Sequence, residues 1–429
     1  MVLNAEQLEH KAHELALTHD PIVGSWNSRK RLAEWHNDRE SLRQFAAELR
    51  SEVGGCTQPA EQWLLDHADF LEKEVQVVER ELKRGALSRQ TWLKADGRPR
   101  TVAIGNAYFE ATNGRLDLDS FVSFIHAYQE IAVLTLAESW LMPVFLRMAA
   151  IGRLAALMRL VRERHVACQR VEKLLKSLAP PDTKLCAADM QAALEKHGQT
   201  LPLSGAVLVH LVSHLNEWAD DAASVREWLV CKLDSNTDNL NRIVTYEHQL
   251  QASHEVETSH LIGSLRTLSR GQWKLYFDRI SVVDRTLAQE AAGTYLRMDD
   301  TSKHTLRSRI ERLSRRFNVP ESLIALKAVE LAEGSLNNDE QASSHSGGSD
   351  GVPPRSSFAA YYLLDHQGVE ALHESLRSCN ANPRTHRGAV VRRRRGTAYL
   401  SMIGCAFIVF AVLFGWWAGS GNGLTTGAW

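Results

Sequence analysis

The sequence predicts an all-α protein: a multi-helix cytoplasmic body in two helical blocks, followed by a single C-terminal transmembrane helix. Three observations predict this fold class. Long segments are rich in Glu, Gln, Leu, Ala and Arg, which are strong helix formers. Apolar residues recur three and four positions apart, and sustained strand alternation does not appear. An uncharged apolar run near the C-terminus has the length of a membrane-spanning helix.

The composition limits the classes of function. The length of 429 residues suggests two or three domains. A formal net charge of -1 argues against a nucleic-acid binder. The six cysteines include no C-x-x-C pair, which fits reduced cytoplasmic thiols better than disulfides or a zinc site. The N-terminus is polar and charged, so we expect no signal peptide.

Residues 1–180 form the first predicted block. An apolar stripe from Trp63 to Val78 marks one of its helices. A turn at Asp117–Ser120 opens another, with Asp or Ser as the N-cap. Pro143 separates a short helical piece from a longer run. The expected helices of the block are, in order, Asn4–Leu17, Ser28–Val53, Pro59–Arg84, Phe121–Glu130 and Val144–Leu178.

The last of these, Val144–Leu178, is the longest amphipathic segment. Its apolar residues share one face, and five arginines lie elsewhere on the helix: Arg147, Arg153, Arg159, Arg162 and Arg164. A basic amphipathic helix is able to lie on an anionic membrane surface. A core helix with a solvated basic face gives the same pattern. We favour the core helix and keep membrane-surface sensing as the alternative.

A Pro-Pro linker precedes the second predicted block, residues 187–334. Residues 335–357 are rich in Ser, Gly, Asn and Pro, so we expect a disordered linker there. Residues 358–396 form a short ordered segment and a basic juxtamembrane stretch. The expected helices of the second block are Leu203–Trp218, Ser224–Leu233, Asn239–Leu268, Gln272–Tyr276, Val282–Glu290, Ser302–Phe317 and Leu323–Ala332.

The apolar run at residues 397–419 is the predicted transmembrane helix, and residues 420–429 form a short non-cytoplasmic tail. Arginine excess marks the cytoplasmic flank of a membrane helix, and aromatic rings prefer the interfaces. We therefore assign six membrane-flanking residues and place the body in the cytoplasm. These residues are Arg392, Arg393, Arg394, Arg395, Trp416 and Trp417.

Acidic pairs raise the question of catalysis. Asp117 and Asp119 match the D-x-D pattern by which nucleotide-sugar transferases hold a divalent metal. Their position at a helix start favours capping instead. Glu72 and Glu74 look like carboxylates on a solvated face.

The histidines and the search for nucleotide-binding motifs also give no sign of a catalytic site. His248, His254 and His260 are six residues apart, a spacing that does not bring helical side chains together. Neither a phosphate-binding loop nor a nucleophile elbow is present in the sequence. We therefore predict no catalytic, cofactor-binding or metal-binding residue and no cofactor in this chain.

Several short motifs follow one another along residues 60–380. They are Glu61–His67 with Phe70–Glu72, Thr112–Asp117, Leu134–Pro143, Glu247–Gln251, Ile262–Arg266, Trp273 with Phe277, Ser281–Asp284, Tyr295–Asp299 and Ala360–Asp365. In this order they resemble motifs of the cyclic β-1,2-glucan synthases. Trp140 and Pro143, for example, lie in a segment similar to that family's P-L-T-L-G-E-L-W-A-L-P.

The resemblance implies a helical region on the cytoplasmic side, ahead of the first membrane helix of such a synthase. That family makes cyclic β-1,2-glucan from UDP-glucose with a transferase domain that these residues do not contain. No catalytic residue is therefore carried over. Trp140 and Pro143 are expected to shape a helix junction, and Arg266 and Asp284 to pair between helices.

We predict a membrane-anchored N-terminal part of a cyclic β-1,2-glucan synthase, non-catalytic by itself. Its partners would be the inner membrane and the remaining parts of the synthase, with no nucleic acid. It would lie in the bacterial inner membrane, with the body cytoplasmic and the C-terminus periplasmic. The alternative is a stand-alone inner-membrane helical adaptor.

Overall fold

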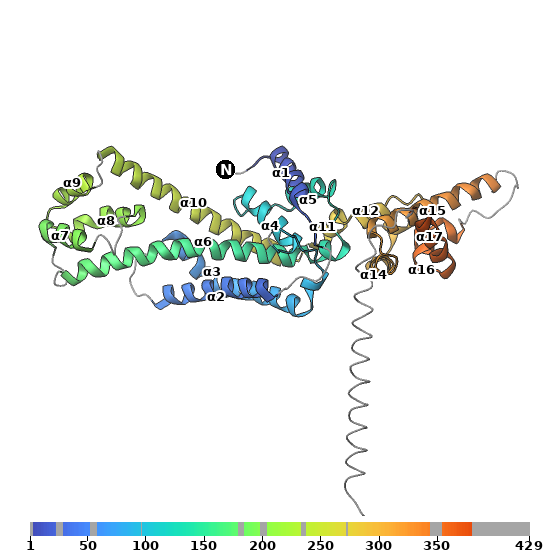
Figure 1. The fold of residues 1–429 in the computed structure, drawn as a ribbon, viewed down its shortest axis with the longest axis horizontal. Helices are drawn as coiled ribbons and strands as arrows, with labels where there is room; N and C mark the ends of the chain where they lie inside the picture. Colours follow the sequence, from blue (N-terminus) through green and yellow to red (C-terminus); the bar gives the residue numbers. More distant parts are fainter. Residues whose placement is uncertain are drawn as a thin grey trace, which may run out of the picture.

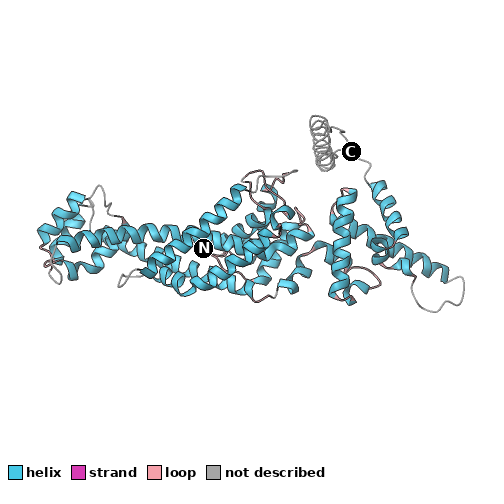
Figure 2. Cartoon of the chain, turned by 90° about the horizontal axis from the view of Figure 1, so that it is seen from below, coloured by secondary structure: helices cyan, strands magenta, loops and turns pink. Residues whose placement is uncertain are grey.

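The computed structural model describes residues 3–22, 29–51, 58–95, 97–178, 184–197, 204–232, 237–271, 273–343 and 354–379. In these ranges the regular structure is helical, with seventeen α-helices, two short 3-10 helices and isolated bridges only. The all-α prediction is confirmed for this part of the chain (Figure 2). The predicted transmembrane helix and all six membrane-flanking residues lie outside it.

The molecule is elongated, and α6 (Leu136–Leu178) and α10 (Thr237–Ser269) run along its length (Figure 1). At 1.5 Å per residue, the 43 residues of α6 span about 65 Å. Different stretches of α6 enter different hydrophobic cores. This one helix therefore connects the middle of the molecule to one of its ends.

The main core joins α6 to the N-terminal helices and to Leu261, Leu265 and Leu268 of α10. Its centre is aromatic: Tyr108 is fully buried and meets Phe121 edge to face, with ring centroids 5.0 Å apart. Such pairs add stability beyond the apolar area they bury. The N-terminal elements are α1 (Ala5–Thr18), α2 (Arg29–Ser51), α3 (Pro59–Lys83), η1 (Ala86–Arg89), α4 (Arg100–Ala111) and α5 (Leu118–Gln129).

Because α10 belongs to the second predicted block, the two predicted blocks contribute to one core. The domain limits drawn from sequence stay predictions.

The helix α6 is a core helix. Within the described ranges it alone is long and apolar enough to cross a membrane, and 72% of its most apolar window is buried inside the protein. The core interpretation of Val144–Leu178 is thus confirmed. The predicted break at Pro143 is wrong, because α6 runs through this proline. Burial of Met142, Phe145 and Leu146 on either side offsets the hydrogen bond that proline cannot donate.

A smaller distal core closes the far end of α6. Val171 and Leu175 of α6 pack there against Leu211 and Leu215. The helices that supply the rest of this core are α7 (Ala187–His197), α8 (Gly205–Trp218) and α9 (Ala222–Lys232). Figure 1 shows these three helices at the end of the molecule opposite α12–α17.

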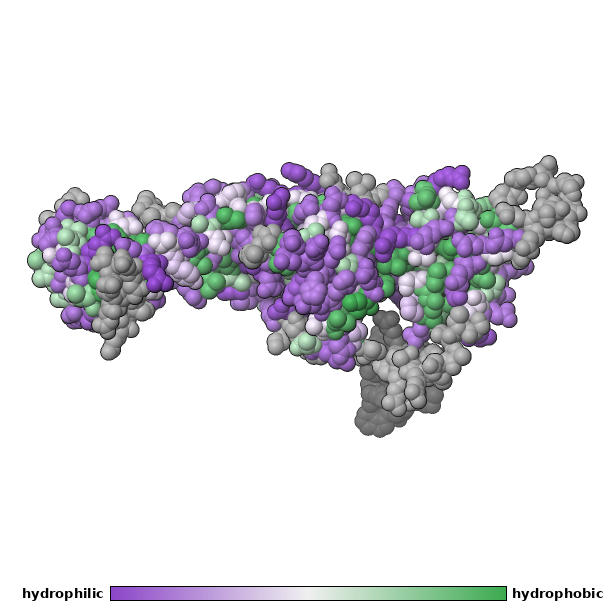
Figure 3. Space-filling view, turned by 90° about the horizontal axis from the view of Figure 1, so that it is seen from above, coloured by the Kyte–Doolittle hydropathy of each residue, from purple (hydrophilic) through white to green (hydrophobic). Residues whose placement is uncertain are grey.

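The C-terminal core lies at the other end, where Leu136 of α6 joins it. On the face drawn in Figure 3, apolar residues gather where this part meets the middle of the molecule. The elements are α11 (Trp273–Ile280), α12 (Val282–Leu287), α13 (Thr294–Arg297), α14 (Asp300–Phe317), α15 (Glu321–Ser343), η2 (Arg355–Ser357), α16 (Ala359–Leu364) and α17 (His366–Cys379).

The helix α15 extends into the predicted disordered linker and ends at Ser343. The first residues of that linker include good helix formers, and the Ser335 hydroxyl donates to the Ser356 hydroxyl at 2.6 Å. The Ser, Gly and Pro residues that suggested disorder are concentrated further on, and residues 344–353 lie outside the described ranges. The start of the predicted linker is therefore helical.

Candidate functional site

The five arginines of the Val144–Leu178 segment are all ion-paired, although Arg159 and Arg162 stay partly exposed to solvent. Each forms an ion pair with a carboxylate of another helix, which ties α6 to α2, α3 and α10. The arginines are therefore engaged by carboxylates of neighbouring helices, which argues against their binding a membrane surface. The pairs are Arg147–Glu74 at 2.7 Å, Arg159–Asp38 at 2.8 Å, Arg164–Glu247 at 3.3 Å, Arg153–Glu257 and Arg162–Glu48.

The pair between Arg147 and Glu74 is buried. Arg147 also donates from its guanidinium to the Leu268 carbonyl at 2.7 Å, so one side chain joins α3, α6 and α10. The prediction that Glu74 faces solvent is wrong, since its residue is only 5% exposed. A buried carboxylate needs a cationic partner, and that partner comes from a helix distant in sequence.

A capping box begins α6. The Thr135 hydroxyl accepts from the Glu138 backbone N–H at 3.2 Å, and the Glu138 carboxylate accepts from the Thr135 backbone N–H at 2.9 Å. Arg100 donates from Nε to the same carboxylate at 3.1 Å and makes a second, shorter bond to its other oxygen. Burial raises the pKa of Glu138, but the Arg100 charge and these hydrogen bonds hold it below its ordinary value. Glu138 is therefore ionised and fully enclosed.

Two of the sequence motifs meet across about 150 positions of sequence. The Ser264 hydroxyl of α10 donates to the Gly114 carbonyl at 2.7 Å and accepts from the Leu116 N–H at 2.7 Å. Gly114 has φ +79°, and a Cβ there would lie 2.9 Å from Leu261. Only glycine fits this close approach without strain. The motifs Thr112–Asp117 and Ile262–Arg266 therefore pack directly against each other.

The acidic pair at the start of α5 is structural. The Asp117 carboxylate accepts from the Ser120 backbone N–H at 3.1 Å, so Asp117 is the N-cap. Asp119 forms an ion pair with Arg279 at 2.6 Å. The capping interpretation is confirmed, and the two carboxylates have separate partners.

The predicted pair between Arg266 and Asp284 is wrong. Asp284 instead accepts from Arg307 at 2.6 Å and from the Tyr295 hydroxyl. Arg266 lies over the Phe70 ring, 5.9 Å from its centroid. Arg307 reaches Asp284 because α14 packs in the C-terminal core, whereas α10 belongs to the main core.

Two of the three spaced histidines of α10 have different partners. The His260 Nδ1 lies 3.0 Å from the Asn113 carbonyl, and the His254 Nδ1 lies 3.4 Å from Arg164. Across the described ranges, no group of three or more His, Cys, Asp or Glu side chains is arranged to hold a metal ion.

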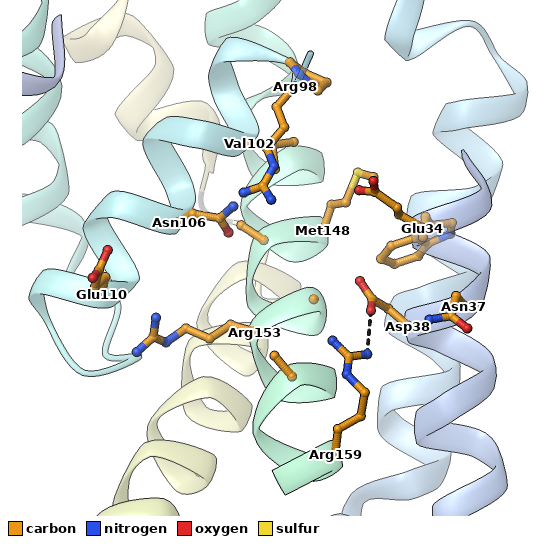
Figure 4. Close-up of a pocket in the computed structure, with 15 residues that line it drawn as sticks. Glu34, Asn37, Asp38, Arg98, Val102, Asn106, Glu110, Met148, Arg153 and Arg159 are labelled. Carbon is orange, nitrogen blue, oxygen red and sulfur yellow. Dashed lines mark hydrogen bonds and ion pairs between the residues drawn. The ribbon is translucent and has the colours of Figure 1, made fainter. Parts of the chain in front are cut away.

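A pocket of about 540 Å³ lies between α2, α4 and α6. Figure 4 shows Arg98 and Asn106 on the α4 side of this pocket and Glu34 and Asp38 on the α2 side, with α6 between them. Its volume is typical of sites for small molecules. It is therefore a candidate for a binding site.

The charges in the pocket balance. Three arginines and three carboxylates line it, and Asp38 is bound to Arg159 at 2.8 Å. Burial raises the pKa of Asp38, although the hydrogen bond and charge of Arg159 oppose this rise. Arg153 reaches out of the pocket to Glu257 of α10. The lining therefore offers donors and acceptors without a strong net charge.

Sequence reasoning missed this pocket. The signal lay in Ala149, Gly152 and Ala156, small residues spaced at three and four on one face of α6. That spacing alone gives no partner helices, and the polar lining comes from segments about 50 and 100 positions earlier. The membrane-flanking residues that were predicted lie beyond the described ranges.

No protein-family model matches this chain. Over 304 residues it is 25% identical to the cyclic β-(1,2)-glucan synthase NdvB of Rhizobium meliloti (strain 1021). The matched region is 69% of this chain but only 10% of that protein. The resemblance of the motifs is thus confirmed as distant homology to part of a cyclic β-1,2-glucan synthase.

Proposed function

We propose that this chain is the membrane-anchored, N-terminal helical region of a cyclic β-1,2-glucan synthase and acts as a scaffold for its transferase and membrane parts. The observation that carries the proposal is the homology over 69% of the chain. The chain spans about a tenth of the length of that relative. We therefore propose, rather than infer from the match alone, that this chain works in a complex that contains the transferase parts and makes glucan from UDP-glucose.

The roles of the motif residues support a scaffold. Glu61 caps α3 and contacts His165 of α6 at 3.0 Å. Glu138 begins α6, and Ser264 holds the turn before α5. Glu61 and Ser264 join elements more than 100 positions apart, and Glu138 also joins α6 to Arg100 of α4. Contacts of this kind hold the shape of the body, and we propose that the body is non-catalytic by itself.

Location is part of the proposal. The apolar run at residues 397–419 would anchor the chain in the bacterial inner membrane. The arginines before it, Arg392 to Arg395, would keep the body in the cytoplasm and the short tail in the periplasm.

Co-purification tests the function. A tagged full-length chain is produced in a bacterium that makes cyclic β-1,2-glucan, and its membranes are dissolved in mild detergent. We expect the captured material to convert radiolabelled UDP-glucose into glucan. The chain purified from a host without such a synthase should show no transfer. Capture without activity favours the stand-alone adaptor, and transfer by the pure chain contradicts a non-catalytic body.

A full-length variant tests the anchor. Val409→Asp with Leu413→Asp places two charges in the middle of the apolar run, each costing roughly 3 kcal/mol in a membrane helix. We expect the variant to leave the membrane fraction, with Val409→Leu as the control that stays. Membrane retention of the double variant contradicts the proposed anchor.

A further inference from the structure

On the α6 side, the pocket between α2, α4 and α6 is lined by the small residues Ala149, Gly152 and Ala156, which leave space inside it. Gly152 has no side chain, and the nearest atom to a Cβ built on it is Asp38 Oδ2 at 3.4 Å. That distance is an ordinary contact, so an alanine fits at this position. A longer side chain has to extend into the pocket, since Gly152 is one of its lining residues.

The lining disfavours an anionic ligand. Arg98, Arg153 and Arg159 are opposed by Glu34, Asp38 and Glu110, so the formal charges sum to zero. Arg159 is bound to Asp38 and Arg153 to Glu257. A phosphate or nucleotide would have to replace these carboxylates on the guanidinium groups. Phosphate sites instead present arginines to the ligand, where they bind its oxygens bidentately.

The same lining suits a neutral ligand with many hydroxyl groups. A hydroxyl both donates and accepts, so it is able to bind carboxylate, guanidinium and amide groups side by side. Asn37 and Asn106 supply the amides. Val102 and Met148 add apolar surface against which the C–H faces of a sugar ring pack. Figure 4 shows Asn106 and Met148 on adjacent walls, so both kinds of contact are available to one molecule.

We propose that this pocket binds a neutral oligosaccharide and that its ligand is a short β-1,2-linked glucan. The pocket's volume, about 540 Å³, lies within the range of small-molecule sites. The choice of linkage rests on the proposed function, whereas the neutral-sugar assignment rests on the lining alone. Glucan bound here would place growing or finished product on the scaffold of the proposed synthase.

Binding of sophorose, the β-1,2-linked disaccharide of glucose, tests the proposal. The full-length chain is purified in a detergent without a sugar headgroup, and saturation-transfer NMR reports contact with the disaccharide. We expect a signal from sophorose that uridine diphosphate does not displace. Absence of a sophorose signal at millimolar concentration, or its displacement by uridine diphosphate, overturns the proposal.

Substitutions place the binding in this pocket. Gly152→Leu should weaken sophorose binding at least tenfold, and Asn106→Ala several-fold. Gly152→Ala should bind like the unaltered chain. Gly263→Leu on α10 is the matched control, because a Cβ there has no atom within 4 Å, and it should also leave binding unchanged. Equal binding by Gly152→Leu and Gly263→Leu, with far-UV circular dichroism showing both folded, overturns the assignment.

Cellobiose, the β-1,4-linked disaccharide, separates this inference from the proposed function. Weaker binding of cellobiose than of sophorose supports the glucan assignment. Equal binding that Gly152→Leu abolishes retains a neutral-sugar pocket and contradicts the β-1,2 linkage. Failure of the co-purification experiment with preserved sophorose binding contradicts the synthase scaffold and not the pocket.

Discussion

The main core and the C-terminal core each enclose a carboxylate–guanidinium pair at the start of a helix, but the two pairs are satisfied differently. In the main core, Glu138 meets Arg100 and both carboxylate oxygens accept hydrogen bonds. In the C-terminal core, Arg307 forms ion pairs with both Asp284 and Asp278, each at 2.6 Å. The Asp284 Oδ2 has no hydrogen-bond partner among the described residues.

The difference shows which core depends on a single ion pair. Arg100 has one carboxylate partner, so loss of that partner leaves a buried charge unpaired. Arg307 has two, and loss of one leaves the other in place. The main core is therefore expected to be the more sensitive of the two to a change in its pair.

The largest effect is expected for Glu138→Gln. The glutamine keeps the shape but leaves the Arg100 guanidinium, 9% exposed, without an anion. We expect a loss of about 3–5 kcal/mol in the free energy of unfolding. Urea unfolding followed by far-UV circular dichroism measures it. The double variant Arg100→Met with Glu138→Leu should recover most of the loss, and a Glu138→Gln loss below about 1 kcal/mol contradicts this role.

The next largest effect is the loss of stability when a glycine beside each core is replaced by alanine. Gly114→Ala meets both a left-handed backbone, φ +79°, and Leu261 at 2.9 Å. Gly293→Ala meets the left-handed backbone, φ +60°, with its nearest atom 3.7 Å away. We expect losses of about 3 kcal/mol for Gly114 and about 1–2 kcal/mol for Gly293 in the same urea experiment. Equal losses would show that the close approach at Gly114 costs nothing.

A smaller effect is expected for Asp284→Asn. The amide oxygen still accepts from Arg307, which also retains Asp278. We expect about 1–2 kcal/mol of destabilisation, less than for Glu138→Gln. Asp278→Asn is the control for the exposed half of the pair, with a loss below about 1 kcal/mol. A greater loss from Asp284→Asn than from Glu138→Gln reverses the ranking of the two cores.

The smallest effect concerns the pH dependence of stability. Two carboxyl groups near the start of α6, Glu138 and Glu321, have pKa values shifted in opposite directions. The pKa of Glu138 is lowered, so its stabilisation is complete above pH 4.5 and is lost as the pH falls through its folded pKa. Burial raises the pKa of Glu321, which accepts from the Leu136 N–H at 2.7 Å. Stability at this site therefore decreases as the pH rises from 4.5 through the folded pKa of Glu321.

Urea midpoints between pH 3 and pH 7 separate the two groups. Glu138→Gln should flatten the acid side of the stability profile, and Glu321→Gln should flatten the decrease above pH 4.5. A profile unchanged by Glu321→Gln would contradict the raised pKa of that carboxyl.

Local features of this fold were predictable from sequence, and long-range ones were not. The N-cap at Asp117 was predicted because a cap and the N–H it accepts from lie within three residues of each other. The amphipathic pattern predicted that Val144–Leu178 is a core helix. The partners of its arginines could not be predicted, because Glu74 and Glu257 lie about 70 and 100 positions away.

The errors have the same physical origin. Pro143 reads as a helix break when only its own backbone is considered, but packing on both sides of it decides the outcome. Arg266 and Asp284 are chemically suited to each other, yet they enter different cores. The pocket requires three helices at once, so a spacing on α6 alone could not reveal it.

The length of α6 couples the stability of the three cores. The helix is held in the main core by buried side chains and ion pairs, while Leu136 enters the C-terminal core and Val171 the distal core. Because one continuous helix of 43 residues enters all three, unwinding it in the middle would withdraw side chains from the cores at its ends. The three cores are therefore expected to unfold together rather than one at a time.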